Sequence, residues 1–350
     1  MNADKARGWL SRYKVPLIGL KIVLSFLLFG YVVAKVSPGD IWATIRGADP
    51  TLLLAAAGLF LFSNLLGSWL WAKLLRAQGV PIPYRKAASY YFVGLFFNNF
   101  FPSNIGGDIV RISDASKHAT HVSPVFSATL MDRLIGVLTI ATVAVLASFA
   151  ALDRFHQFAI YVSILIVFGV SLALFVSIFH RGVLEAFEWP FRVIGARRIE
   201  QGIARLMDDL HGFRHTGSAL SQAVLASTLV QISRILVHYL VGVALGVRVA
   251  AGYYFLFVPV LAALISLPIS LNGLGVREGA GVVLFQSAGM SKEQAFTVPF
   301  LTYLISVMIS RLGGLIFVSR QPRQALRTMM ERRRNARAGE SEVEPVEQER

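Results

Sequence analysis

Charged side chains occur inside long apolar stretches of this sequence, where each is costly to bury. A charge at the middle of a membrane helix costs at least about 2.5–3.5 kcal/mol, so such a residue indicates a site or an internal ion pair. The residues concerned are Asp108, Arg111, Asp132, Arg133, Arg234, Arg277, Glu278 and Arg311. Arginine can bind a phosphate through two parallel hydrogen bonds. We therefore expect an anion site, suited to a phosphate, around Arg111 and Arg277.

Glycines precede both of these arginines. Glycine lets a ligand approach the backbone closely, and the free N–H groups at the start of a helix attract anions. We expect one helix to begin near Gly106 and another near Gly275, with both starts facing the anion. The candidate substrate-binding residues are Arg111, Arg277, Asp108, Glu278, Gly106, Gly107, Gly273, Gly275, Arg133 and Arg311.

A purely structural role is the alternative for these charges. Arg111 and Asp108 are three residues apart and can pair along one helix. Arg277 can pair with Asp108, and Arg111 with Glu278, which would tie the two glycine-containing segments together.

Arg133 and Arg311 can likewise anchor their helices to a carboxylate. Asp132 is expected near the lipid headgroups. His238 follows Arg234 by one helical turn and can relay protons, although such a histidine is more often a satisfied core group.

The composition indicates that membrane helices position these residues. The 350-residue chain is 55% hydrophobic and 15% charged, whereas soluble domains carry about 25% charge. Its mean hydropathy is +0.59. The net charge of +14 resides mainly between the apolar stretches, where orientation in a membrane explains it better than nucleic-acid binding does. The chain has no cysteine, which excludes disulfides and thiolate chemistry.

Six stretches approach or exceed the roughly 20 apolar residues that cross a bilayer. They are 15–36, 51–74, 124–152, 158–179, 219–247 and 295–318. Two further stretches, 87–118 and 253–288, are interrupted by Pro and Gly. If each interrupted stretch enters and leaves the membrane on the same side, the loops rich in Lys and Arg all lie on the cytoplasmic side; otherwise they do not. The predicted fold is an all-α polytopic membrane protein with six full spans plus two re-entrant helical hairpins, and both termini are cytoplasmic.

The two interrupted stretches resemble each other. Pro102 to Arg111 and Pro268 to Arg277 cover the same distance, and a Tyr-Tyr-Phe precedes each. By the predicted topology the units around them start on opposite sides of the membrane. This pattern predicts an inverted repeat of span–hairpin–span units, which is typical of secondary transporters.

These elements make up one predicted transmembrane domain. It covers 1–320, with repeat 1 at about 51–152 and repeat 2 at about 219–318. An amphipathic cytoplasmic segment is expected at 181–215, and a disordered tail at 321–350.

Motifs for other chemistry are missing from the sequence. It contains no Walker A loop, no clustered metal-ligand pattern and no dinucleotide fingerprint in a strand–helix context. We expect no catalytic residue, no metal and no cofactor, and therefore a protein that is not an enzyme.

The stretches 96–111 and 267–279 resemble the two characteristic segments of the lysylphosphatidylglycerol synthase transmembrane region family. Residues 131–136 resemble the helix that follows in that family, although Asp132 stands where the family usually has Glu. The resemblance covers about residues 15–320. It implies a flippase-like module that is fused, in two-part members, to a soluble aminoacyl transferase. Because only about 30 polar residues follow the resembling part, we do not expect that transferase here.

We therefore expect a flippase-like transporter of the bacterial inner membrane that moves a lipid with a phosphate-bearing or other polar headgroup. One alternative is an integral lipid-modifying transferase with Asp108 or Glu278 as base. Another is a non-transporting partner of a lipid-synthesis enzyme, including one in hopanoid or isoprenoid lipid export. The expected partners are the membrane lipid and the bilayer, with no nucleic acid. A lipid-synthesis enzyme and a second copy of the chain remain open as partners.

Overall fold

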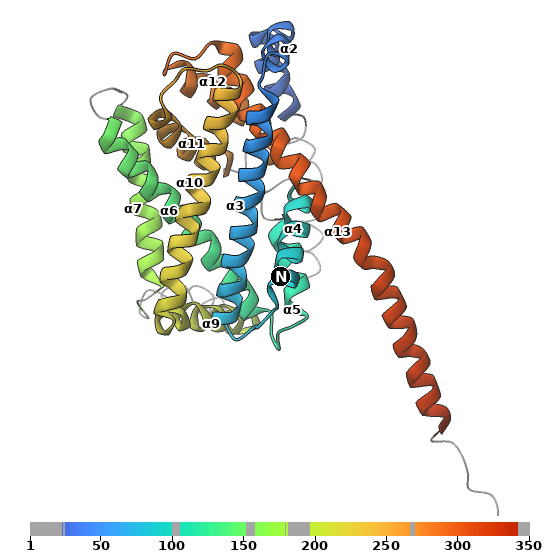
Figure 1. The fold of residues 1–350 in the computed structure, drawn as a ribbon. Coiled ribbons are helices and arrows are strands. Elements are labelled where there is room, and N and C mark those ends of the chain that lie inside the picture. The colour runs from blue at the N-terminus through green and yellow to red at the C-terminus, as the bar shows by residue number, and fades with distance from the viewer. Residues whose placement is uncertain are drawn as a thin grey trace, which may run out of the picture.

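The computed structural model describes residues 23, 25–99, 106–151, 158–178, 180, 197–266 and 270–341. This part of the chain is helical and contains no strand, as predicted for an all-α protein. Figure 1 shows most of the helices gathered in one bundle, from which the last helix projects.

Four helices are long and apolar enough to cross a bilayer. They are α3 (Pro50–Ala77), α6 (Ser123–Ala151), α10 (Gly217–Ala244) and the first part of α13 (Lys292–Ser341). Four of the six predicted spans are thereby confirmed by length and composition. The other two correspond to shorter apolar helices, Ser25–Val36 and the main part of α7 (Phe158–Ser177). The protein is therefore a multi-pass membrane protein.

Local sequence signals set the ends of α3. Asp49 caps its start, because the Asp49 carboxylate accepts a 2.8 Å hydrogen bond from the backbone N–H of Thr51. Gly79 ends it with a φ of 73°, a conformation that favours glycine. Gly246, with the same φ, follows the end of α10 in the same way.

Two pairs of shorter helices lie between the long ones. The first pair is α4 (Tyr84–Asn98) and α5 (Gly106–Ser116). The second is α11 (Ala251–Ser266) and α12 (Val276–Gln286), with the short turn η2 (Leu271–Gly273) before α12. The predicted helix starts near Gly106 and Gly275 are confirmed. Residues 100–105 and 267–269, which include Pro102 and Pro268, lie outside the described residues.

The two pairs occupy opposite ends of the bundle. Figure 1 shows α4 and α5 toward the end where α9 (Arg197–Gly212) lies. It shows α11 and α12 toward the other end, near α2 (Pro38–Arg46). The first helix of each pair also contacts the long helix that follows the other pair in the sequence. Helix α4 packs against α13, which follows α12, and α11 packs against α6, which follows α5.

The segment predicted as amphipathic is described from residue 197 onward, as α9 and the turn η1 (Phe213–His215). Leu206, Met207 and Leu210 of α9 pack into an apolar cluster with α3 and α6. The apolar face of this helix is therefore buried on the bundle end. Residues 181–196 lie outside the described residues.

The predicted disordered tail differs from the structure over 321–341, because α13 continues as a helix to Ser341. This part of the sequence is rich in Arg, Met, Glu and Ala, which are good helix formers, so local propensity accounts for the continuation. Figure 1 shows it projecting from the bundle. Residues 342–350 lie outside the described residues.

Candidate functional site

A cavity of about 450 Å³ lies within the bundle. On the long helices its lining residues fall at 60–70 of α3, 132–140 of α6 and 227–238 of α10, about half-way along each helix. On these helices the lining lies mainly between the parts that build two separate apolar cores. Both hairpins contribute to its wall. The charged lining residues are Asp108, Arg111, Asp132, Arg133, Arg234 and Arg277.

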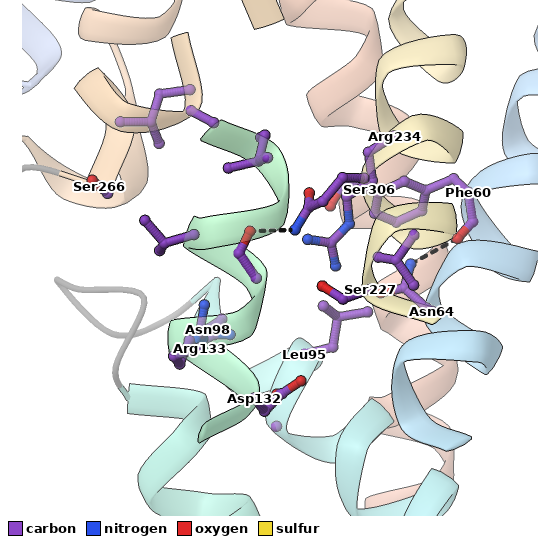
Figure 2. Close-up of a pocket in the computed structure, with 18 of the residues that line it drawn as sticks. Phe60, Asn64, Leu95, Asn98, Asp132, Arg133, Ser227, Arg234, Ser266 and Ser306 are labelled. Atoms are coloured by element: carbon purple, nitrogen blue, oxygen red, sulfur yellow. Dashed lines mark hydrogen bonds between the residues drawn. The ribbon is translucent and has the colours of Figure 1, made fainter. Parts of the chain in front are cut away.

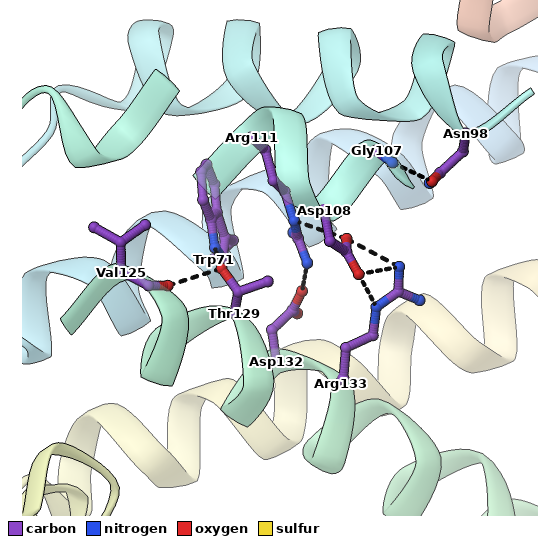
Figure 3. Close-up of polar contacts among 9 residues, drawn as sticks. All are labelled: Trp71, Asn98, Gly107, Asp108, Arg111, Val125, Thr129, Asp132 and Arg133. Carbon is purple, nitrogen blue, oxygen red and sulfur yellow. Dashed lines mark hydrogen bonds and ion pairs between the residues drawn. The ribbon is translucent and has the colours of Figure 1, made fainter. Parts of the chain in front are cut away.

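Four of these charges form one chain of ion pairs between α5 and α6 (Figure 3). Arg111 lies between two aspartates, 3.0 Å from Asp108 and 2.9 Å from Asp132. The Asp108 carboxylate also accepts two hydrogen bonds from Arg133, from Nε at 2.9 Å and from Nη2 at 3.0 Å. Two arginines and two aspartates therefore balance each other's charge.

Aromatic rings complete the surroundings of Arg111. Its guanidinium carbon is 5.0 Å from the centre of the Trp71 ring and 5.3 Å from that of Tyr91, so cation–π attraction adds to the ion pairs. The Trp71 Nε1–H donates to Thr129 at 3.1 Å, which fixes the indole against α6. Arg111 is only 4% exposed. These contacts are the ones that the structural alternative requires, in which Arg111 is a brace.

Arg277 has a different environment. Its Nη2 donates to the carbonyl of Asn272 at 2.7 Å, and its guanidinium lies 4.0 Å from the ring centre of Tyr303. The nearest carboxylate oxygen belongs to Glu278, 3.9 Å from Nη1 and without a hydrogen bond to it. Arg277 therefore lacks the two close ion pairs, at 3.0 and 2.9 Å, that hold Arg111.

Neither predicted tie between the hairpins is present in the described part of the chain. Arg277 does not pair with Asp108, and Arg111 does not pair with Glu278. The cause is that both Asp108 and Glu278 already have partners nearby. Glu278 is fully buried, does not line the cavity and accepts a 2.7 Å hydrogen bond from the backbone N–H of Gly275.

The four predicted glycines do not line the cavity. Asn98 accepts a 2.7 Å hydrogen bond from the N–H of Gly107, just as Glu278 occupies that of Gly275. A side chain on Gly107 would overlap the Gly94 carbonyl oxygen, and one on Gly275 would meet Leu28. Gly273, with a φ of 78°, lies against Ile265, and Gly106 is buried in α5. The described contacts of Gly107, Gly273 and Gly275 favour close packing over an open anion site.

Arg311 is the remaining predicted residue. It is exposed, lies outside the cavity and forms no ion pair with any described residue. Arg133, which the predicted repeat matches to it, does line the cavity and holds Asp108, so among the described residues only Arg133 shows the predicted anchoring to a hairpin carboxylate.

Asp132, Arg234 and Asn64 are among the lining residues that the predicted binding set left out. Asp132 was expected near the headgroups but pairs with Arg111 inside the bundle. Arg234 extends from α10 toward the middle of the cavity (Figure 2) and has no carboxylate partner among the described residues. Asn64 of α3 is fully buried at the same wall. A lone arginine inside an apolar span was the only sequence signal for Arg234.

The lining carries more positive than negative charge, with four arginines against two aspartates. His238 also lines it and is bonded through Nδ1 to the carbonyl of Arg234 at 3.0 Å. No cluster of three or more His, Cys, Asp or Glu residues that could hold a metal occurs among the described residues. The arrangement can hold an anion with polar substituents at mid-bundle depth.

A family model for the lysylphosphatidylglycerol synthase TM region matches residues 18–314. The chain belongs to this family. The match includes both hairpins and every charged residue of the cavity, so the site is part of the region that defines the family. It ends shortly before the projecting part of α13.

Similar curated proteins span most of the chain. A UPF0104 membrane protein of Pyrococcus horikoshii is 25% identical over 338 residues, covering 88% of this chain and 97% of the relative. One of Methanothermobacter thermautotrophicus is 26% identical over 315 residues, covering 83% and 92%. The glycosyltransferase AglD of Haloferax volcanii is 24% identical over 337 residues, covering 84% of this chain and 53% of AglD. No solved structure matches the chain.

Proposed function

We propose that the protein is a flippase-like transporter that moves a lipid with a phosphate-bearing or other polar headgroup across the bacterial inner membrane. The central cavity would hold the headgroup, and the acyl chains would stay in the bilayer. Arg234 and Arg277 are the cations best suited to contact it, because Arg111 and Arg133 are held by the two aspartates.

The observation that carries this proposal is the depth of the charged cavity. Its lining lies half-way along α3, α6 and α10, each of which is long enough to cross the bilayer. Charges at that depth are costly and are retained for a substrate or ion pathway. A polar headgroup that crosses the membrane needs such a compensated site at mid-depth.

An inverted repeat is the second part of the proposal. Under it, α3, α4, α5 and α6 correspond to α10, α11, α12 and α13. The contacts agree with this scheme: α3 packs on α4 as α10 packs on α11, and α4 packs on α13 as α11 packs on α6. α3 and α10 themselves form the most extensive contact between any two helices of the described chain. Two hairpins that enter from opposite sides would give the cavity alternating access.

A lipid-modifying transferase is the second candidate, because one relative carries the name glycosyltransferase. In that case a carboxylate would have to act as a base. Asp108 receives two arginines and Glu278 caps its own helix, so neither is poised to accept a proton from a substrate. The transporter is therefore the better-supported function.

Reconstitution into liposomes tests the proposal. Phospholipids labelled on an acyl chain would be placed in one leaflet, and their appearance in the other followed with a membrane-impermeant quencher. We expect translocation by the wild type, strong loss with Arg277→Ala and full activity with Arg248→Gln, which lies in the exposed loop after α10. Lipids recovered afterwards would be analysed for new products. If the labelled lipid does not change leaflet, the transport function is refuted. If a new lipid product is found, the transferase function is supported instead.

A further inference from the structure

Four polar atoms of the cavity-lining residues are buried and lack a hydrogen-bond partner within the described structure. They are Oδ1 of Asn64, Nε of Arg111, Nε of Arg234 and Nη1 of Arg277. Nε of Arg111 lies 3.0 Å from the Asp108 carboxylate in an ion pair, so the other three atoms are the ones left for a ligand. Leaving a buried polar group unpaired costs about 1–3 kcal/mol, so such groups at a cavity indicate a missing ligand. Apart from the ion-paired Nε of Arg111, two of these atoms donate hydrogen bonds and one accepts them.

The charges of the cavity indicate what the two donors would meet. Arg111 and Arg133 are balanced by Asp108 and Asp132. Arg277 has the buried carboxylate of Glu278 at 3.9 Å. The remaining cation is Arg234, which leaves one positive charge without a described counter-charge. A single negative charge on the ligand would neutralise it.

The unpaired acceptor indicates the second feature of the ligand. Asn64 donates through Nδ2 to the carbonyl of Phe60 at 2.8 Å, which fixes the amide and leaves Oδ1 free (Figure 2). A hydroxyl group would satisfy Oδ1 without adding charge. An ammonium group would bring a second positive charge to a wall whose two aspartates are already paired, and a buried unpaired charge is far more costly than a neutral donor.

Resting on the proposed transport function, we infer that the cavity selects a lipid with one phosphodiester anion and an uncharged, hydroxyl-bearing alcohol as headgroup. The phosphodiester would contact Arg234 and Arg277, and a hydroxyl would donate to Asn64. Other uncharged polar residues of the wall, Asn98, Gln231, Ser227, Ser306 and Tyr303, suit such an alcohol. Lipids with an aminoacylated or otherwise cationic headgroup would be disfavoured.

Four short-chain lipids that differ only in the headgroup would test this selectivity by competition against a chain-labelled lipid on the purified protein. Phosphatidylglycerol has the anion and hydroxyls, whereas phosphatidylethanol has the anion alone. Phosphatidylethanolamine adds one amino group, and lysyl-phosphatidylglycerol adds the two amino groups of lysine. We expect phosphatidylglycerol to compete at least about tenfold better than each of the others, the equivalent of one satisfied buried hydrogen bond. Glycerol 3-phosphate and inorganic phosphate serve as soluble competitors.

Two variants assign the preference to residues. Asn64→Leu should remove the difference between phosphatidylglycerol and phosphatidylethanol, and leave the difference from the cationic lipid. Arg234→Gln should weaken the binding of phosphatidylglycerol and reduce the discrimination against lysyl-phosphatidylglycerol. Arg248→Gln is the control and should change neither. Melting temperatures of all variants would be measured, so that misfolding is not mistaken for lost selectivity.

The outcomes separate this inference from the proposed function. Equal competition by all four lipids, or a preference for a cationic one, would overturn the inference even if the lipid is transported. Equal competition by the soluble phosphates would show a site for free phosphate compounds and overturn the lipid assignment. The expected preference would support the inference even if the liposome assay shows no translocation, and in that case only the transporter would fail.

Discussion

At the scale of single residues, the bundle is held near its centre by a buried arginine. Arg111 joins α5 to α6 through Asp132 and stacks between Trp71 of α3 and Tyr91 of α4. Four helices therefore meet on one side chain. A buried ion pair adds little net stability compared with an apolar pair, but the loss of one partner strands the other charge.

Replacement of Arg111 by alanine should therefore destabilise the protein by up to about 3–5 kcal/mol, because the partly buried carboxylate of Asp132, 17% exposed, would lose its partner. The double variant Arg111→Ala with Asp132→Asn should recover much of that loss. Thermal unfolding in detergent measures both. Arg311→Ala, at an exposed position of α13, is the control and should change the melting temperature little. A wild-type melting temperature for Arg111→Ala would contradict the role as a brace.

The spacing of charged residues along the sequence was enough to predict part of this site. Asp108 and Arg111 lie one helical turn apart, and their predicted pairing is found at 3.0 Å. The pair between Arg111 and Asp132 could not be predicted, because it depends on how α5 lies against α6. The importance of Arg234 was equally hidden, since a sequence does not show which cation is left without a carboxylate.

At the scale of elements, the α4–α5 hairpin depends on close backbone approach. The ideal Cβ on Gly94 would lie 2.7 Å from the carbonyl oxygen of Gly107, and one on Gly107 would lie 2.6 Å from Oδ1 of Asn98. The N–H of Gly107 meets the same Asn98 atom. Helices as short as α4 and α5 depend on tertiary packing for their stability. Glycine at these two positions allows the close packing of one helix on the other.

Gly107→Ala should force α5 away from α4 and destabilise the protein by about 1–3 kcal/mol, the usual range for overpacking. Gly58→Ala is a matched control in α3, since nothing lies within 4 Å of the position its Cβ would take. There alanine should be neutral or slightly stabilising, because it favours a helix more than glycine does. Equal melting temperatures for the two variants would show that the close approach contributes nothing.

The helices themselves were largely predictable, because length and apolarity identify a membrane span with little help from tertiary structure. α3, α6, α10 and the first part of α13 match predicted spans. The functions of the glycines were not predictable. A glycine before a helix start fits both an anion site and a packing contact, and only the position of the neighbouring helix distinguishes them.

At the scale of the whole molecule, the hairpins meet near the cavity through asparagines. Asn99, after α4, donates to Ser310 of α13 at 2.7 Å, and Asn272 of η2 donates to Asn99 at 3.5 Å. A contact between the ends of two hairpins places both ends inside the bundle. This arrangement is what re-entrant hairpins from opposite membrane sides would produce, and it leads to a topological prediction.

The chain has no cysteine, so single cysteines can report the membrane side of each position. If α4 and α5 are re-entrant, Lys86→Cys and Lys117→Cys should react on the same side as Gln201→Cys of α9, which the basic residues place in the cytoplasm. Ala250→Cys and Ser287→Cys, before and after the second hairpin, should react on the opposite side with Asp40→Cys. All six positions are exposed.

An impermeant thiol reagent applied to intact cells and to inverted vesicles measures the side of each position. Positions 40, 250 and 287 should be labelled in cells, and 86, 117 and 201 only in inverted vesicles. A hairpin that crossed the membrane fully would place 86 and 117 on opposite sides, because the two positions flank α4 and α5. That result would remove the inverted repeat, since the second unit would then start on the same side as the first. Labelling of 86, 117 and 201 together in intact cells would instead reverse the orientation, and the three arginines of α9 outside would contradict the charge rule on which the topology rests.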